Sequence, residues 1–428
     1  MDFSLLEIIS HLSPVEILFI TIAGAFAFYF FLAKQYHVII FILALSASLV
    51  GTTIPIIANI AALCRWLSIL MLLMTGFLQS RIKVSLGVLL FWGYIVLGVI
   101  FLFRAVQLTW QLQRGILLLL VAAAIPLAYS VETYKSLRLS LISISIVAAI
   151  YSLLNFVSLP SQLDEAIRYS GFSKGAPTFV IILGSLLPFT LWGLWRIDRK
   201  VIQIACGLGL LLGIITLIFS GQRTGTVAGI ISLIPLILAF PKRKTIGWSV
   251  LVLIVLLLLA YVLLQQTSAE RLNFLLRRYS LEAGLSLRNI IWSTALSEIA
   301  KTPFLGRGIG AAETVISSSF HNAYLEVWYN TGIVGLFLFL ASQLYFFYRI
   351  FYLRGITKDP EIKSFLALAL GYMMGFTVIS IFESIGAGAS NLSLILYLFL
   401  GVMVSNNQLA DYPQRSRERK PLLQYSPI

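Results

Sequence analysis

The sequence predicts an all-α, polytopic membrane protein with about 12, or at most 13, transmembrane helices and one large helical loop outside the cytoplasm. Of its 428 residues, 59% are hydrophobic and 11% are charged, whereas soluble domains carry about 25% charged residues. The mean hydropathy is +0.95, and no acidic residue occurs between Glu16 and Glu132. Long apolar runs follow one another almost to the C-terminus, which is typical of a bundle of membrane helices.

Apolar segments of about 17–22 residues are long enough to span a bilayer. They lie at 15–33, 38–53, 62–79, 84–103, 113–131, 138–158, 175–195, 201–220, 223–240, 246–264, 331–350, 364–383 and 391–405. The segments 38–53 and 391–405 are short for a span, so the expected total is about 12 or 13.

Basic residues predict how the helices are oriented, because Lys and Arg accumulate in cytoplasmic loops. They cluster in alternate connections: Lys34, Arg81 and Lys83, Lys135 and Arg138, Arg196 to Lys200, Lys242 to Lys244, Arg349 to Lys363, and the tail RSRERK. The net charge of +14 therefore indicates cytoplasmic loops, and we expect no nucleic acid as a partner. This orientation places the C-terminus in the cytoplasm and leaves the side of the N-terminus open.

Four regions follow from this orientation. Residues 1–264 form an N-terminal transmembrane bundle, 265–330 a large hydrophilic loop on the outer face, and 331–406 the C-terminal transmembrane helices. Residues 407–428 form a polar cytoplasmic tail that we expect to be disordered.

Arginines are retained on the outer face, where the charge rule disfavours them. The main ones are Arg168, Arg223, Arg277, Arg278 and Arg288. Arg223 lies in a short connection between apolar runs, so its guanidinium sits at the membrane boundary; at a span centre it would cost about 2.5–3.5 kcal/mol. It is either an interface arginine that reaches into the headgroups or part of an anion site, because a planar guanidinium grips phosphate oxygens in pairs.

Within the large loop, the pattern around Arg288 predicts an amphipathic helix followed by a stop. Apolar residues repeat at helical spacing from Leu287 to Ala295, and Arg288 and Trp292 lie four apart on one face. Pro303 and the glycines after it permit a tight turn. A surface helix without a role is an equal alternative at this point.

His321 is one of three histidines in the chain and lies at the start of a helix predicted over about 320–331. The serines 317–319 offer an N-cap, and Gly332 offers a stop. In the first turn, the positive helix end would keep the imidazole neutral and able to accept a proton. A structural histidine is the more common outcome for such a residue.

Several catalytic motifs are absent from the sequence. The chain has no HExxH, no CxxC, no carboxylate cluster at metal-ligand spacing, no Walker loop, no Rossmann fingerprint and no GxSxG. We therefore expect no metal site and no cofactor. A substrate that arrives already activated would fit this absence.

The stretch HNAYLEVWYNTGIVG carries a recognisable motif. It fits the pattern His, then Asn, Ser or Gln, nine residues, Gly, two residues, Gly, on His321, Asn322, Gly332 and Gly335. This resembles the motif of the bacterial O-antigen ligase and O-antigen polymerase superfamily.

Three further segments resemble motifs of the same superfamily. SGQRTGTVAGIISL resembles its Arg-x-x-x-Leu motif, with Val227 in place of the leucine that follows Arg223. RNIIWSTALSEIAKTPFLGRGIG resembles its Arg-to-Trp segment and glycine turn. RYSGFSKGAPTF, which begins at Arg168, is similar to its first periplasmic arginine segment.

The resemblance implies a multi-pass enzyme of the bacterial inner membrane with its active site on the periplasmic face. It implies inverting, metal-independent transfer of a glycan from undecaprenyl pyrophosphate to a sugar hydroxyl of lipid A–core, as in an O-antigen ligase. Arg223 and Arg288 would then neutralise the pyrophosphate, and His321 would accept the hydroxyl proton. The expected substrate-binding residues are Arg168, Asn322, Trp292, Arg277 and Arg278.

Two other functions stay open. A polymerase of O-antigen or exopolysaccharide would use the same donor, although the single large outer loop favours a ligase. A transporter or flippase for anionic lipid-linked glycans could also place arginines at the membrane boundary. It should show charged groups near mid-span, whereas Glu16, Arg65 and Glu383 are expected near span ends.

Overall fold

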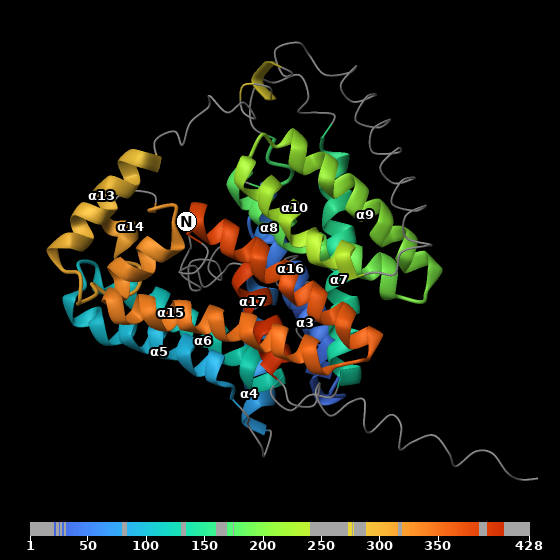
Figure 1. Ribbon diagram of the computed structural model, residues 1–428, viewed down its shortest axis with the longest axis horizontal. Coiled ribbons are helices and arrows are strands. Elements are labelled where there is room, and N and C mark those ends of the chain that lie inside the picture. Colours follow the sequence, from blue (N-terminus) through green and yellow to red (C-terminus); the bar gives the residue numbers. More distant parts are fainter. Residues whose placement is uncertain are drawn as a thin grey trace, which may run out of the picture.

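The computed structural model describes residues 21–22, 25, 28–29, 31–78, 84–129, 134–159, 169–173, 175–239, 273–275, 277, 288–315, 319–384 and 392–405. Within these residues the chain is helical, and an isolated antiparallel bridge joins Thr52 and Ser173. Figure 1 shows the helices as a bundle, with α13 (Arg288–Lys301) and α14 (Ala312–Val315) at one end of it. We call this end the site end. The all-α expectation is confirmed for the described residues.

Eight of the described helices are long and apolar enough to cross a membrane. They are α4 (Pro55–Leu78), α5 (Leu86–Ile100) with the 3-10 turn η1 (Phe101–Arg104), α6 (Leu108–Tyr129), α7 (Tyr134–Val157), α8 (Ala176–Arg196), α9 (Lys200–Phe219), α15 (Ala323–Ile356) and α16 (Pro360–Phe382).

Three shorter apolar helices complete the described bundle: α3 (Tyr36–Leu49), α10 (Arg223–Ala239) and α17 (Leu392–Ser405). These eleven helices, eight long and three short, coincide with eleven of the predicted apolar segments. The segment 246–264 and most of 15–33 lie outside the described residues. The total of about 12 or 13 spans therefore stays a prediction.

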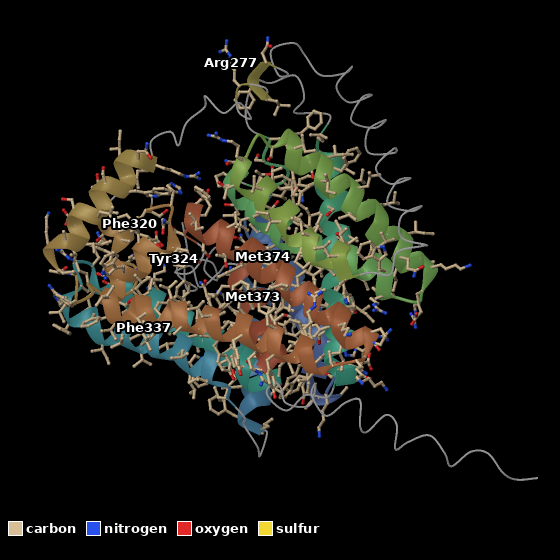
Figure 2. All side chains as sticks on the ribbon, viewed as in Figure 1. Arg277, Phe320, Tyr324, Phe337, Met373 and Met374 are labelled. Atoms are coloured by element: carbon tan, nitrogen blue, oxygen red, sulfur yellow. The ribbon has the colours of Figure 1, made fainter. Side chains whose placement is uncertain are left out.

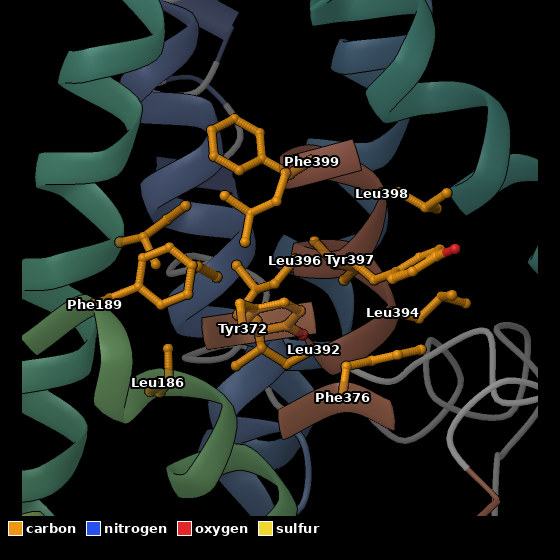
Figure 3. Close-up of a cluster of buried hydrophobic side chains, with 14 of the residues drawn as sticks. Leu186, Phe189, Tyr372, Phe376, Leu392, Leu394, Leu396, Tyr397, Leu398 and Phe399 are labelled. Atoms are coloured by element: carbon orange, nitrogen blue, oxygen red, sulfur yellow. The ribbon is translucent and has the colours of Figure 1, made fainter. Parts of the chain in front are cut away.

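The centre of the bundle is formed by α17, in which every residue from Leu392 to Val404 is buried. A helix of 14 residues is about 21 Å long, which is shorter than the hydrocarbon core of about 30 Å. Its apolar residues lie on all sides, as expected for a helix enclosed by others. Figure 3 shows its side chains between those of α8 and α16, where the Tyr397 ring stacks on Phe376 with centroids 4.5 Å apart.

Two glycines of α16 allow the backbone of α10 to approach closely. A Cβ atom on Gly371 would lie 2.1 Å from the carbonyl oxygen of Ser232, and one on Gly375 would lie 3.1 Å from that of Ala228. The contact thus moves from Ser232 back to Ala228 on α10 as it moves from Gly371 forward to Gly375 on α16, so the two helices run antiparallel. The same antiparallel register brings the start of α10 to the level of the end of α16, at the site end.

The turn after α13 is held between α5 and α15, which lie side by side (Figure 1). The backbone N–H of Ile309 donates to the carbonyl of Gly98 at 3.3 Å, and that of Ile333 donates to the carbonyl of Pro303 at 3.0 Å. Helix α15 bends sharply at Gly332, whose φ is 68°. The predicted stop at Gly332 is therefore a kink, and the helix continues beyond it.

One position relevant to the transporter alternative differs from expectation. Arg65 lies near the middle of α4, is 4% exposed, and its guanidinium carbon lies 5.0 Å from the centroid of the Trp66 ring. The prediction that Arg65 lies near a span end was wrong, because α4 begins at Pro55, before the apolar run at 62–79.

Candidate functional site

A buried carboxylate joins two of the predicted site residues. Glu383 Oε1 lies 2.8 Å from Arg288 Nη2, and Glu383 Oε2 lies 3.1 Å from His321 Nδ1. The Glu383 side chain is 10% exposed, against 23% for Arg288 and 33% for His321. Hydrogen bonds to an ionised acceptor are shorter and stronger than those between neutral groups, so this carboxylate helps to fix the positions of both side chains.

The three residues come from segments far apart in the sequence. Arg288 is the first residue of α13, Glu383 follows the last residue of α16, and His321 precedes α15. Phe382 packs α13 against α16: its ring centroid lies 5.6 Å from the guanidinium carbon of Arg288 and 6.1 Å from the ring centroid of Trp292. The predicted common face of Arg288 and Trp292 is therefore confirmed.

His321 lies in a tight turn and not in a helix. Its φ of 48° is in the left-handed region, which is uncommon for a residue with a Cβ atom and marks a strained backbone. Helix α15 begins at Ala323, and its N-cap is Asn322, whose side chain accepts a hydrogen bond from the N–H of Leu325. The predicted cap at 317–319 and the placement of His321 in the first helical turn were wrong. The group that faces the imidazole is the Glu383 carboxylate and not the N-terminal end of a helix.

Phe320, the residue before His321, is held through both of its backbone polar groups. The Glu326 carboxylate, which is 2% exposed, accepts from the N–H of Phe320 at 3.2 Å. Trp292 donates its Nε1–H to the Phe320 carbonyl at 3.1 Å. Figure 2 labels Phe320 at the site end. These two hydrogen bonds constrain the backbone on the N-terminal side of His321, as a strained conformation requires.

The start of α10 reaches the same cluster. Arg288 Nη1 donates to Thr224 Oγ1 at 3.4 Å, and Arg223, the first residue of α10, directly precedes Thr224. Arg223 is half-buried. The predicted arginines 223 and 288 therefore lie on neighbouring segments, and the structure brings both to the site end.

Of the other predicted arginines, the structure describes Arg277 alone. Arg168 and Arg278 lie outside the described residues. Arg277 is exposed, and Figure 2 shows it well apart from Phe320. Tyr169, which follows Arg168, is buried and bonded to Ser158 Oγ at 2.8 Å; its burial raises the pKa of the phenol to about 12. Tyr169 therefore anchors its segment as a neutral side chain.

Sequence reasoning missed two carboxylates of this site. Glu383 was considered only as a charge at the end of a span, and Glu326 was not singled out. A signal existed for Glu383, which stands at the end of the apolar run 364–383, whereas Glu326 is one of several acidic residues of the large loop and nothing in the sequence set it apart. Buried carboxylates persist in proteins when they are paired or hydrogen-bonded, and both of these are.

Comparison with known families adds an independent finding. Residues 208–340 match the model of the O-antigen ligase family. This segment contains Arg223, Arg288 and His321, so the resemblance drawn from their motifs is confirmed, whereas Glu383 lies beyond it. Among curated proteins, none matches the chain significantly. The protein is thus a multi-pass membrane protein with a segment similar to the O-antigen ligase family, and it resembles enzymes of the ligase or polymerase kind.

Proposed function

We propose that the protein is an O-antigen ligase, a membrane glycosyltransferase that moves a glycan from undecaprenyl pyrophosphate to a sugar hydroxyl of lipid A–core. The observation that carries the proposal is the contact of Glu383 with both Arg288 and His321. The Glu383 carboxylate thus holds both the Arg288 guanidinium, which suits a diphosphate, and the His321 imidazole, which suits a hydroxyl proton. The family match supports the same class of enzyme.

His321 is the proposed general base. The acceptor hydroxyl oxygen attacks the anomeric carbon of the donor, and the bond from that carbon to the diphosphate oxygen breaks. His321 accepts the hydroxyl proton at Nε2, because Nδ1 faces Glu383. The carboxylate orients the ring and stabilises the imidazolium that forms. Attack opposite the leaving group inverts the anomeric centre, and a base of this kind contributes about 10²–10⁴ in rate.

Arg288 and Arg223 are the proposed electrostatic partners of the leaving diphosphate, whose negative charge grows as the bond breaks. Glu383 holds Nη2 of Arg288, and Nη1 makes a long contact of 3.4 Å with Thr224, so Nη1 retains the capacity to donate to phosphate. Removing one such donor costs roughly 10²–10³ in rate. Trp292, Asn322, Arg168, Arg277 and Arg278 stay proposed substrate contacts.

We place the site end on the periplasmic face of the inner membrane. The support comes from the opposite end, where Arg138 Nε lies 2.6 Å from Glu361 Oε1 at the start of α16, and Arg196 donates to the carbonyl of Pro360. Basic residues gathered at one end of a bundle indicate its cytoplasmic side. Glu383, at the other end of α16, then faces the periplasm.

The test uses the purified protein in lipid nanodiscs with a synthetic undecaprenyl-pyrophosphate glycan and lipid A–core. His321→Ala should bind the donor normally, and its transfer rate should fall by about 10²–10⁴. The matched variant His37→Ala, at the start of α3, should transfer normally. Unchanged turnover of His321→Ala would remove His321 from the mechanism. Transfer to a glycan in place of lipid A–core would assign a polymerase, and donor translocation without covalent product would assign a transporter.

A further inference from the structure

The turn that follows α13 exposes large apolar side chains. Phe304 is 72% exposed and Leu305 is 53% exposed. Apolar surface left in water costs about 25 cal/mol per Å² relative to burial. Contiguous exposed apolar residues in a polar loop therefore indicate a surface that contacts something other than water.

This turn is fixed to the ends of two candidate membrane spans. Arg104, the last residue of η1, donates from Nη1 to the carbonyl oxygens of Leu305 at 3.4 Å and Gly306 at 3.3 Å. The backbone N–H of Ile333, just after the kink of α15, donates to the carbonyl of Pro303 at 3.0 Å. The turn therefore lies at the level where α5 with η1, and α15 beyond its kink, reach the site end.

The exposed side chains of the turn continue an apolar band on these helices. On α5 and η1, Val96, Ile100 and Phe103 are 47%, 55% and 76% exposed. On α15, Val334 and Phe337 are 54% and 68% exposed, and Phe337 is labelled in Figure 2. Apolar side chains on the outer faces of spanning helices contact lipid. Phe304 and Leu305 extend this surface onto the loop.

We propose that the turn 303–306 inserts Phe304 and Leu305 among the acyl chains of the lipid leaflet at the site end. Arg104 then lies at the level of the lipid phosphates, with its stem along apolar surface and its charge in the headgroup region. Lys301, three residues before Phe304, is 58% exposed and pairs with Glu298, and a charged pair at such an exposed position belongs on the aqueous side. The surface of the hydrocarbon therefore passes between residues 301 and 304.

The insertion anchors the C-terminal end of α13 to the membrane. Arg288 starts the same helix, so the anchor sets the height of its N-terminal end above the lipid. The proposal does not depend on the reaction that the protein catalyses.

The test measures membrane depth with a nitroxide label. Single cysteines replace Phe304 or Leu305 in a full-length background with Cys64→Ala and Cys206→Ala, reconstituted in nanodiscs of phosphatidylethanolamine and phosphatidylglycerol. Phe103→Cys is the lipid-facing control and Lys301→Cys the aqueous control. Electron paramagnetic resonance compares collisions of each label with oxygen, which partitions into lipid, and with a water-soluble nickel chelate.

We expect oxygen collisions to dominate at 304 and 305, as at 103, and nickel collisions to dominate at 301. Dominant nickel collisions at 304 and 305 would place the turn in water and overturn the proposal. Low collision rates with both reagents would show that protein covers the turn and would overturn it equally. The labels at 304 and 305 are in separate variants. If one of these variants does not fold, the other still tests the proposal.

Discussion

Replacing Glu383 by glutamine removes one negative charge and keeps the shape of the side chain. Arg288 Nη2, at 2.8 Å, and His321 Nδ1, at 3.1 Å, then face a neutral amide. A hydrogen bond to a charged partner contributes about 1.5–3 kcal/mol. Arg288 and His321 are 23% and 33% exposed, so solvent screens both contacts. We therefore take the free energy of one such hydrogen bond as the loss for the two contacts together. The transfer rate should fall by roughly 10- to 150-fold, with a smaller change in the KM for the acceptor.

The assay is glycan transfer by the purified Glu383→Gln protein, with Glu361→Gln as the matched control. Glu361 stands at the other end of the same helix and pairs with Arg138, the two side chains being 34% and 32% exposed. An exposed pair of this kind contributes about 0–1 kcal/mol, and it is far from the proposed chemistry. The control should therefore transfer at the wild-type rate. Wild-type transfer by Glu383→Gln at equal protein levels would refute the reasoning.

Three other perturbations test separate parts of the site. Glu326→Ala should lower the free energy of unfolding by about 1–3 kcal/mol, because it leaves the buried N–H of Phe320 without its acceptor. The control Glu326→Gln keeps an acceptor oxygen, so equal losses of stability in thermal unfolding of the two variants would contradict this. Gly332→Ala should destabilise the protein by about 1–3 kcal/mol, because φ is 68° and ψ is −178°, and because its Cβ would lie 2.2 Å from the Phe304 carbonyl oxygen. Gly355→Ala meets nothing within 4 Å, so similar melting of the two variants would disprove the strain. Chelation with EDTA should leave transfer unchanged, because guanidinium groups neutralise the diphosphate in the proposed mechanism, and a loss of transfer that Mg²⁺ restores would argue for a metal.

Most described helices were predictable because their apolar runs are long and continuous. The predicted run 223–240 is the helix Arg223–Ala239, and 391–405 is Leu392–Ser405. The errors fall where a helix continues past its apolar part: the helix predicted over about 320–331 and the span predicted over 331–350 are one helix, α15, which bends at Gly332. Hydropathy detects the side chains that meet lipid, whereas backbone hydrogen bonding continues a helix through polar residues.

The site was predictable only where its geometry is local. The spacing of four residues placed Arg288 and Trp292 on one face, and both contact Phe382. The contact of His321 with Glu383 joins residues 62 apart in sequence and depends on how α15 packs on α16, which no local pattern encodes. The left-handed backbone of His321 stands beside Phe320, which Glu326 and Trp292 hold by hydrogen bonds, and no sequence pattern announces this arrangement.

The position of Glu383 in the chain has a consequence for biosynthesis. Arg288 and His321 leave the ribosome first, and the only later helix described is α17. Until α16 has entered the membrane, the guanidinium and the imidazole have no shared acid to hold them together. Translation must therefore pass Glu383 before the site can exist, and a chain cut short after α15 would insert its earlier helices and still be inert.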